Sequence, residues 1–187
     1  MAICYNISMK KILFKFVRIV DLNGKNIEMS PARSEKCRSI KNDAVRTQYL
    51  ASSAALHGIL GDNATSFRYG DNGRPCVDGG FVSCAHTDGA AVCVFSDVPV
   101  GCDIEKSGRE LTGKMQMRFG DIHEWLALEA CVKMTGEGLA GIKKYRRSGD
   151  VMLDMDGNIV AHARFLEYDE YSIAVCCSEE FEIKTAE

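Results

Sequence analysis

The sequence lacks the patterns that mark membrane, secreted and zinc-binding proteins. No run approaches the roughly 18 consecutive apolar residues that a membrane-spanning helix needs. The apolar stretch 10–18 is interrupted by charged residues, and no cleavage site of the signal-peptide type follows it. The nine cysteines include no CxxC pair and no Cys/His spacing typical of zinc sites. We therefore expect a cytoplasmic protein without a membrane partner, whose cysteines are reduced and mostly buried.

A strong excess of charge is also missing. The formal net charge is −3 at pH 7, so nucleic-acid binding would have to depend on a local basic patch, and we expect no nucleic-acid partner. Of the 187 residues, 46% are hydrophobic, which is enough to build a core in one domain or in two small, tightly packed lobes. No low-complexity segment or flexible linker interrupts the chain.

The first half of the sequence predicts a lobe of strands and a long helical stretch. Ser30-Pro31 opens a helical pattern that continues to about Leu60. Short strands separated by Gly, Asp and Pro follow a loop. The predicted strands are 2–8, 12–20, 81–85, 90–95 and 100–104, and the loop is 70–80.

The second half predicts one well-defined helix and three strands. Asp121 resembles a helix N-cap, and the helical pattern from Trp125 to Thr135 ends at Gly136. The predicted strands are 150–153 and 159–165, which flank a turn, and 171–177. The strands 90–96 and 172–178 are similar, so either the two halves repeat each other or two apolar strands are alike by chance.

Asp103 and Glu105 form the sharpest local pattern. Alternate residues of a strand point to the same side, so both carboxylates lie on one face. Such a pair suits a magnesium ion, which prefers oxygen ligands. Taken alone, the pair is also compatible with a solvated strand face.

The predicted helix carries Trp125, Glu129 and Lys133 at successive i, i+4 positions. An aromatic, an acid and a base therefore line one helix face, although an ordinary salt-bridged helix has the same pattern. Upstream, basic residues outnumber acidic ones and favour an anion site or, equally, a solvated helix face. They are Arg33, Lys36, Arg38, Lys41 and Arg46, which Arg74 and His86 could join.

The order and spacing of these motifs resemble the 4′-phosphopantetheinyl transferases, in particular the larger two-lobed type that activates surfactin-synthetase-like systems. The resemblance covers about residues 1–139, and the rest matches only as a terminal lobe with strands. The matching segments are 31–38 with Asp43 and Arg46, then 73–75, then 82–87 running into 101–106, and last 125–139.

The resemblance implies a pseudo-twofold α+β fold of two similar lobes, 1–98 and 99–187, within one compact unit. Coenzyme A would lie in the cleft between them, as the substrate. The implied activity is magnesium-dependent transfer of the phosphopantetheine group to a serine of an acyl or peptidyl carrier protein, with release of 3′,5′-ADP, in fatty acid or secondary metabolite biosynthesis. Manganese could replace magnesium, and we expect a monomer.

The resemblance also implies a role for each site residue. Glu129, directly or through a water on the metal, would take the proton of the carrier serine, and Lys133 and magnesium would stabilise the departing 3′,5′-ADP. The implied metal ligands are Asp103, Glu105 and Glu129. The implied coenzyme-binding residues are Arg33, Lys36, Arg46, Arg74 and His86 at the 3′-phosphoadenosine end, and Lys133 at the pyrophosphate.

The chain departs from the family pattern at Leu128, where the family usually has lysine. One pyrophosphate cation is therefore missing, and Lys114 or Lys143 could compensate for it. The usual Ser-His-Ser is here Ala85-His86-Thr87, and the segment 106–125 is shorter than in larger members. The alternative interpretations are a catalytically impaired relative that binds coenzyme A or a partner protein, and a plain nucleotide-binding or structural α+β module.

Overall fold

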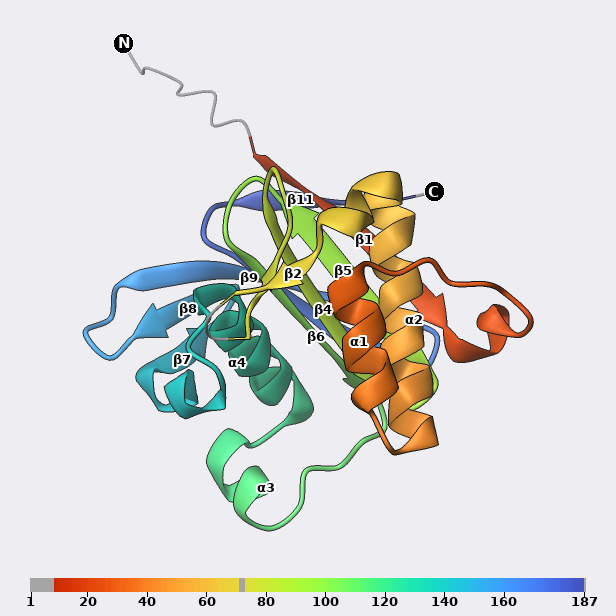
Figure 1. The fold of residues 1–187 in the computed structure, drawn as a ribbon. Helices are drawn as coiled ribbons and strands as arrows, with labels where there is room; N and C mark the ends of the chain where they lie inside the picture. Colours follow the sequence, from red (N-terminus) through yellow and green to blue (C-terminus); the bar gives the residue numbers. More distant parts are fainter. Residues whose placement is uncertain (1–8, 71–72, 187) are drawn as a thin grey trace.

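The computed structural model describes residues 9–70 and 73–186, and the strand predicted at 2–8 lies outside them. These residues form a mixed α+β fold with two larger sheets and a two-stranded ribbon of β2 and β3 (Figure 1). The first sheet has the order β11-β1-β5-β4 and the second β6-β10-β9-β8-β7. The strands are β1 (Lys10–Arg18), β2 (Arg68–Tyr69), β3 (Pro75–Cys76), β4 (Phe81–Thr87), β5 (Ala90–Ser96), β6 (Val100–Lys106), β7 (Tyr145–Ser148), β8 (Val151–Asp154), β9 (Ile159–Tyr168), β10 (Tyr171–Cys177) and β11 (Phe181–Thr185).

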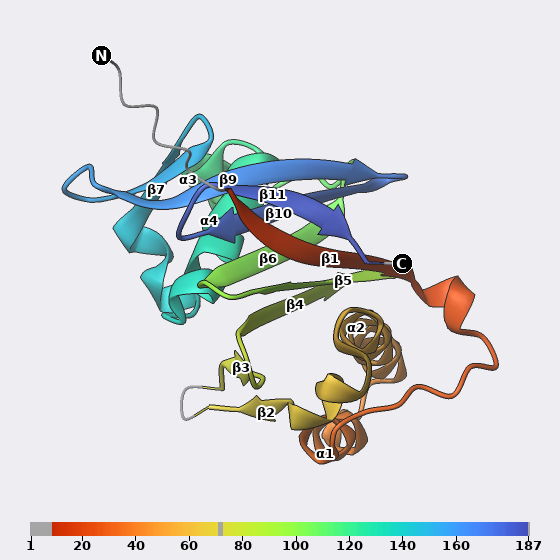
Figure 2. The same ribbon diagram turned by 90° about the horizontal axis from the view of Figure 1, so that it is seen from above.

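The elements are stacked in layers, with the two sheets packed between helices (Figure 2). The α-helices are α1 (Pro31–Ser39), α2 (Asp43–Leu60), α3 (Lys114–Phe119) and α4 (Ile122–Thr135), and the 3₁₀ helices are Ile19–Leu22, Gly61–Ser66 and Leu139–Lys144. One core cluster joins inward side chains of both sheets, for example Phe14 and Val92 with Ile104 and Ile173. A second cluster covers the outer face of the second sheet with α4, and a third covers the first sheet with α2. Strand β10 is buried on both faces and is apolar except for Ser172, whose hydroxyl is hydrogen-bonded to Ser107 and Glu167.

The helical stretch predicted from Ser30 to Leu60 is two helices. The Ser30 hydroxyl accepts from the Arg33 amide at 3.2 Å and caps α1, as the sequence suggests. However, Ile40 has an extended backbone with ψ 115° and ends α1. Asn42 then caps α2, because its side-chain oxygen accepts from the Val45 amide at 3.1 Å. The predicted stretch is therefore helical but is interrupted at residues 40–42, where the second N-cap lies.

The prediction for α4 is confirmed. Asp121 accepts from the Glu124 amide at 2.8 Å as N-cap, and Gly136 ends the helix in the left-handed region at φ 78°. The helix packs on β6 and β10. The apolar side chains that the helix buries include Leu126, Leu128 and Val132.

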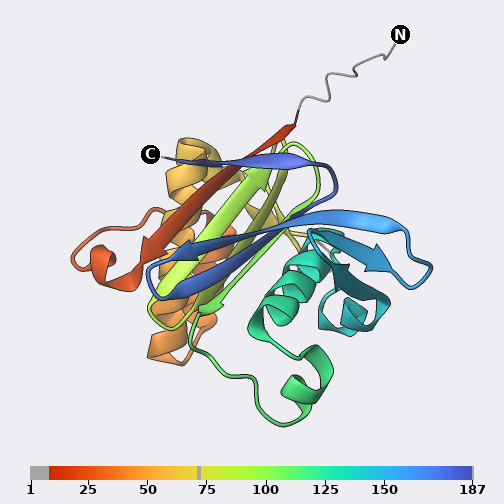
Figure 3. The ribbon, with the colours of Figure 1, turned by 180° about the vertical axis from the view of Figure 1, so that it is seen from behind.

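Several elements were not predicted. Strand β3 lies within the predicted loop 70–80, and β7, β11 and α3 lie in segments without a strong periodic pattern. Strand β11 pairs in parallel with β1, from Lys10 opposite Phe181 to Phe14 opposite Thr185. Figure 3 shows this pairing, by which the C-terminal strand joins the sheet that the first half of the chain forms.

The cysteines follow the prediction only in part. Cys37, Cys102, Cys131, Cys176 and Cys177 are free and buried, and Cys76 is free and half-buried. Cys84 and Cys93, however, form a disulfide. They lie directly opposite each other on β4 and β5, with a Cα–Cα distance of 4.2 Å. The expectation that all cysteines are reduced is therefore wrong for this pair, which strand register and not sequence spacing brings together.

The contact of α4 with β6 depends on Gly101. A Cβ at this position would lie 2.6 Å from the Met134 amide nitrogen and would also meet the Ala130 carbonyl, both in the backbone of α4. We expect Gly101→Ala to lower the free energy of unfolding by about 2–3 kcal/mol, because the helix must shift. Gly108→Ala is the matched control, since a Cβ added there would have no neighbour within 4 Å. Urea unfolding of both variants measures the difference, and equal stabilities would contradict the proposed close contact.

Candidate active site

Strand β6 and helix α4 together place an acidic and basic cluster at the edge of the second sheet. Gly101, Asp103 and Glu105 lie on the face of β6 that α4 covers, while Cys102 and Ile104 point into the core between the sheets. The Lys133 ammonium donates to Asp103 Oδ1 at 2.6 Å and lies 3.8 Å from Glu129 Oε2. The structure therefore brings together Asp103, Glu129 and Lys133, three of the residues predicted from sequence.

The charges in this cluster are strongly coupled. Burial, and next the negative charge of Asp103, raise the pKa of Glu129 from 4.5 to about 7. Burial acts to lower the pKa of Lys133, but Asp103 and other negative neighbours outweigh it, so this pKa is raised. The cluster is thus two carboxylates around one ammonium, in which Glu129 changes its charge near neutral pH.

Glu105, the third predicted metal ligand, is engaged elsewhere. The Thr87 hydroxyl donates to Glu105 Oε2 at 3.0 Å, and the Arg109 guanidinium forms an ion pair with Oε1. Within residues 9–70 and 73–186, no group of three or more His, Cys, Asp or Glu side chains is close enough to hold a metal ion. The donor chemistry of Asp103 and Glu129 nevertheless fits a divalent cation, since an ammonium already lies against both carboxylates.

A cavity of about 230 Å³ adjoins Lys133. Its wall comes from 73–75, from β4 and from the C-terminal end of α4 with the glycines that follow. The Arg74 Nη2 donates to the Met134 carbonyl at 2.7 Å, and its guanidinium lies 5.5 Å from the centre of the Phe81 ring. Arg74 therefore satisfies a carbonyl at the end of α4 and lines the cavity together with Lys133.

The other predicted coenzyme-binding residues are not gathered at this cavity. Arg33 is only 3% exposed, donates to Ser53 at 2.9 Å and to Ser52 at 2.6 Å, and packs between Tyr49 and Phe67. Its burial lowers the pKa of its guanidinium. Arg33 thus lies inside the layer that α1 and α2 form.

Lys36, Arg46 and His86 lie at three different places. Lys36 is exposed on α1, and Arg46 forms an ion pair with Asp43. The His86 side chain is exposed on β4, but nearby protein groups displace some of the water around its ring, and this desolvation, followed by the positive charges of Lys133 and Arg33, lowers its pKa. His86 therefore lies within electrostatic reach of Lys133 and is neutral over a wider pH range than a free histidine.

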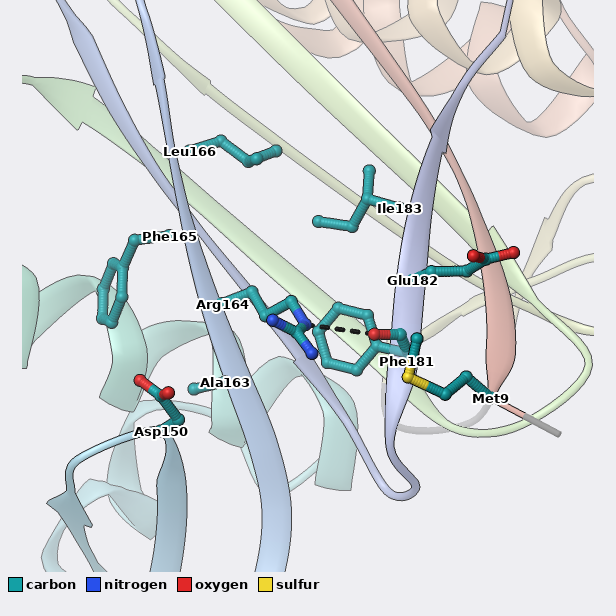
Figure 4. A pocket seen from close by; sticks show the side chains of 9 residues that line it. All are labelled: Met9, Asp150, Ala163, Arg164, Phe165, Leu166, Phe181, Glu182 and Ile183. Atoms are coloured by element: carbon teal, nitrogen blue, oxygen red, sulfur yellow. Dashed lines mark hydrogen bonds between the residues drawn. The ribbon is translucent and has the colours of Figure 1, made fainter. Parts of the chain in front are cut away.

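A larger cavity lies away from these residues, between β9 and β11 (Figure 4). Its lining is mainly apolar, and the Arg164 Nε donates to the Phe181 carbonyl at 3.0 Å. It shares no lining residue with the cavity beside Lys133. Because the charged cluster of Asp103, Glu129 and Lys133 lies away from this larger cavity, we place the candidate active site at β6 and α4.

Sequence reasoning missed Arg109 as part of the site. It follows Glu105 by four residues, but it lies beyond β6 and not on a helix, so no regular spacing predicts the contact. Sequence reasoning also missed Ser83, whose hydroxyl accepts from the Cys102 amide at 3.1 Å and joins β4 to β6 across the two sheets.

None of the helices in the described ranges is both long and apolar enough to cross a membrane.

The raised pKa of Glu129 has a consequence for stability. Above about pH 4.5 the unfolded chain releases the Glu129 proton while the folded protein keeps it, so this residue lowers the free energy of unfolding as the pH rises to about 7. Without divalent cations, Glu129→Gln should therefore be more stable than the wild type near pH 8 by roughly 1–3 kcal/mol, and no more stable near pH 5. Thermal unfolding in EDTA across this range measures it, with the exposed Glu110→Gln as control. A pH-independent difference would contradict the assignment.

Comparison with known proteins identifies a distant relative. No family model matches the chain. The 4′-phosphopantetheinyl transferase Sfp of Bacillus subtilis (strain 168) is 25% identical over 188 aligned positions, which cover 80% of this chain and 82% of the relative. The motifs on β6 and α4 had pointed to the same type of enzyme. The chain is thus a distant homologue of this surfactin-associated 4′-phosphopantetheinyl transferase.

Proposed function

We propose that this protein is a 4′-phosphopantetheinyl transferase, which moves the phosphopantetheine group of coenzyme A to a serine of an acyl or peptidyl carrier protein. The observation that carries the proposal is the convergence of Asp103, Glu129 and Lys133 where α4 packs on β6, beside a cavity that Arg74 also lines. The distant homology supports the same reaction. The proposal includes a pseudo-twofold arrangement of lobes 1–98 and 99–187, and an enzyme of the cytoplasm.

Coenzyme A would enter the cavity beside Lys133 with its phosphates toward this lysine. A volume of about 230 Å³ is small for a ligand pocket, since such pockets typically span about 300–1,000 Å³. Only part of the coenzyme therefore lies inside. Arg74 offers further guanidinium donors at the rim, which suits the phosphoadenosine end.

The remaining basic residues keep their predicted roles as part of the proposal. Lys36, Arg46 and His86 would contact the adenosine end when the coenzyme is bound. We propose that Arg33 acts indirectly, because its guanidinium already donates hydrogen bonds to Ser52 and Ser53 and so holds α1 against α2. The effect of Arg33 on coenzyme binding would then pass through the position of α1.

Magnesium, or manganese, would be held by Asp103 and Glu129 and, after Glu105 leaves Arg109, by Glu105. A divalent cation at these acids would neutralise the phosphate charge that develops during the reaction. When the divalent cation replaces the Lys133 ammonium between the two carboxylates, this lysine would be free to contact a phosphate oxygen. The proposal thus gives Lys133 two partners, the acids in the free protein and the phosphate in the complex.

The reaction needs a proton acceptor at the carrier serine. Glu129 is the candidate for this role, because it lies beside Lys133 and Asp103 in the site. Its pKa of about 7 holds without a divalent cation, and a bound cation would lower it. The serine oxygen forms a bond to the β-phosphorus of coenzyme A, the bond from this phosphorus to 3′,5′-ADP breaks, and the serine proton passes to Glu129. Lys133 would stabilise the negative charge of the leaving 3′,5′-ADP.

A second candidate function is a relative that binds coenzyme A without transferring the group. It is favoured by Leu128, which is 4% exposed and packed in the core that α4 forms with the second sheet. This position can therefore supply no cation to the pyrophosphate. Retention of Asp103, Glu105 and Glu129 favours the enzyme.

Intact mass spectrometry of an apo carrier protein tests the proposal. With coenzyme A and magnesium, the carrier should gain the mass of one phosphopantetheinyl group, and EDTA should prevent this. Asp103→Asn should lower the rate at least about 100-fold, because it removes a charged ligand beside Lys133. No gain with several carriers, while coenzyme A still binds, would support the second candidate and contradict the first.

A substitution at Arg74 distinguishes an effect on coenzyme binding from an effect on the rate of the reaction. We expect Arg74→Ala to raise the KM for coenzyme A about tenfold and to change kcat less, because the adenosine end of the substrate does not change during the reaction. Arg68→Ala is the matched control, since Arg68 pairs with Asp78 in an exposed ion pair. Steady-state rates with varied coenzyme A measure both constants, and an unchanged KM would refute the placement of Arg74.

A further inference from the structure

Arg109 holds one of the three acids of the site. It follows β6 on the segment that leads to α3, and its Nη1 pairs with Glu105 Oε1. The Arg109 side chain is 44% exposed, whereas that of Glu105 is 15% exposed. The carboxylate is thus the more buried partner, and the guanidinium lies on its solvent side with several of its five donors available.

The positive charge of Arg109 also acts on the cluster around Lys133. It is one of the charges that oppose the rise in the pKa of Glu129. Together with Thr87 and Glu105, Arg109 lines a cavity of about 630 Å³. Lys106, which also lines it, is paired with Asp88 at 2.8 Å. Arg109 is therefore a cationic side chain that contacts a site acid, faces open space and lies within electrostatic reach of Glu129.

We propose that Arg109 is a second cationic residue of the active site. In the free protein it pairs with Glu105, and on substrate binding it exchanges this carboxylate for a phosphate oxygen of coenzyme A, while Glu105 turns to a divalent cation. The inference rests on the proposed function. It supplies a positive charge that the buried Leu128 cannot supply.

The exchange is chemically balanced. A guanidinium binds carboxylates and phosphates through the same planar pair of N–H donors, so Arg109 loses no hydrogen bond when one replaces the other. The pair is only partly exposed, but each partner gains a new contact when the pair opens, Arg109 with the phosphate and Glu105 with the cation, and this offsets the cost of opening. Divalent cations and Arg109 therefore compete for Glu105, while coenzyme A and Arg109 bind each other.

This competition predicts opposite effects of one substitution. In Arg109→Gln, calorimetric titration with manganese chloride alone should show about threefold tighter binding, because Glu105 is released. Titration with coenzyme A in the presence of manganese should show about tenfold weaker binding, because a charge-assisted contact is lost. Arg109→Lys should recover part of the coenzyme affinity. Arg146→Gln, which removes an exposed arginine on β7, is the charge-matched control and should change neither value.

The outcomes separate this inference from the proposed function. Tighter manganese binding with weaker coenzyme binding in Arg109→Gln supports it. If both affinities fall, Arg109 only supports the fold of the site, and if neither affinity changes, Arg109 has no role in binding. Both results overturn the inference. The proposed function is kept in either case if the wild-type protein loads the carrier. A wild-type protein that binds no coenzyme A overturns both. Matching circular dichroism spectra of the variants show that they are folded.

Discussion

The contact between α4 and β6 positions the charged groups of the candidate active site. Gly101 has no side chain, so the α4 backbone at Ala130 and Met134 lies directly on the strand. This approach places Lys133 2.6 Å from Asp103, whose side chain is only 8% exposed. A buried carboxylate without a partner is strongly destabilising, so the ammonium makes the burial of Asp103 possible. The packing of one helix thus sets both the stability of the acid and the position of the groups that would meet a phosphate.

The parts of this site that depend on local periodicity could be predicted from the sequence. Asp103 and Glu105 share a strand face because side chains alternate, and Glu129 and Lys133 share a helix face because they are four residues apart. Asp121 and Gly136 mark the ends of α4 through their own backbone and side-chain chemistry. The α+β class follows from the same patterns. The family resemblance added the one long-range statement, that these two faces belong to one site.

Contacts set by tertiary packing could not be predicted in this way. Arg33 lies in a basic segment, yet two serines and two aromatic rings of distant segments enclose it. Cys84 and Cys93 meet because of strand register, and β11 returns to β1 although its sequence is short and only partly apolar. The orientation of Glu105 toward Arg109 depends on a loop beyond β6. Arg33, β11 and Glu105 each depend on a partner in another element or in a loop, and the disulfide depends on the register of a hairpin that residue spacing alone does not fix.

The net charge of the candidate site depends on having Leu128 instead of a lysine. With Glu129 ionised, three carboxylates face Lys133 and Arg109, so the free site carries one net negative charge. A lysine beside the acids would cancel it, but Leu128 is buried among apolar side chains and leaves the charge in place. One divalent cation would then reverse the sign and create a positive site for the pyrophosphate. Because the metal-free site is negative here and would be neutral with the lysine, the proposed coenzyme binding at the pyrophosphate would depend on the divalent cation more strongly here than in a homologue with the lysine.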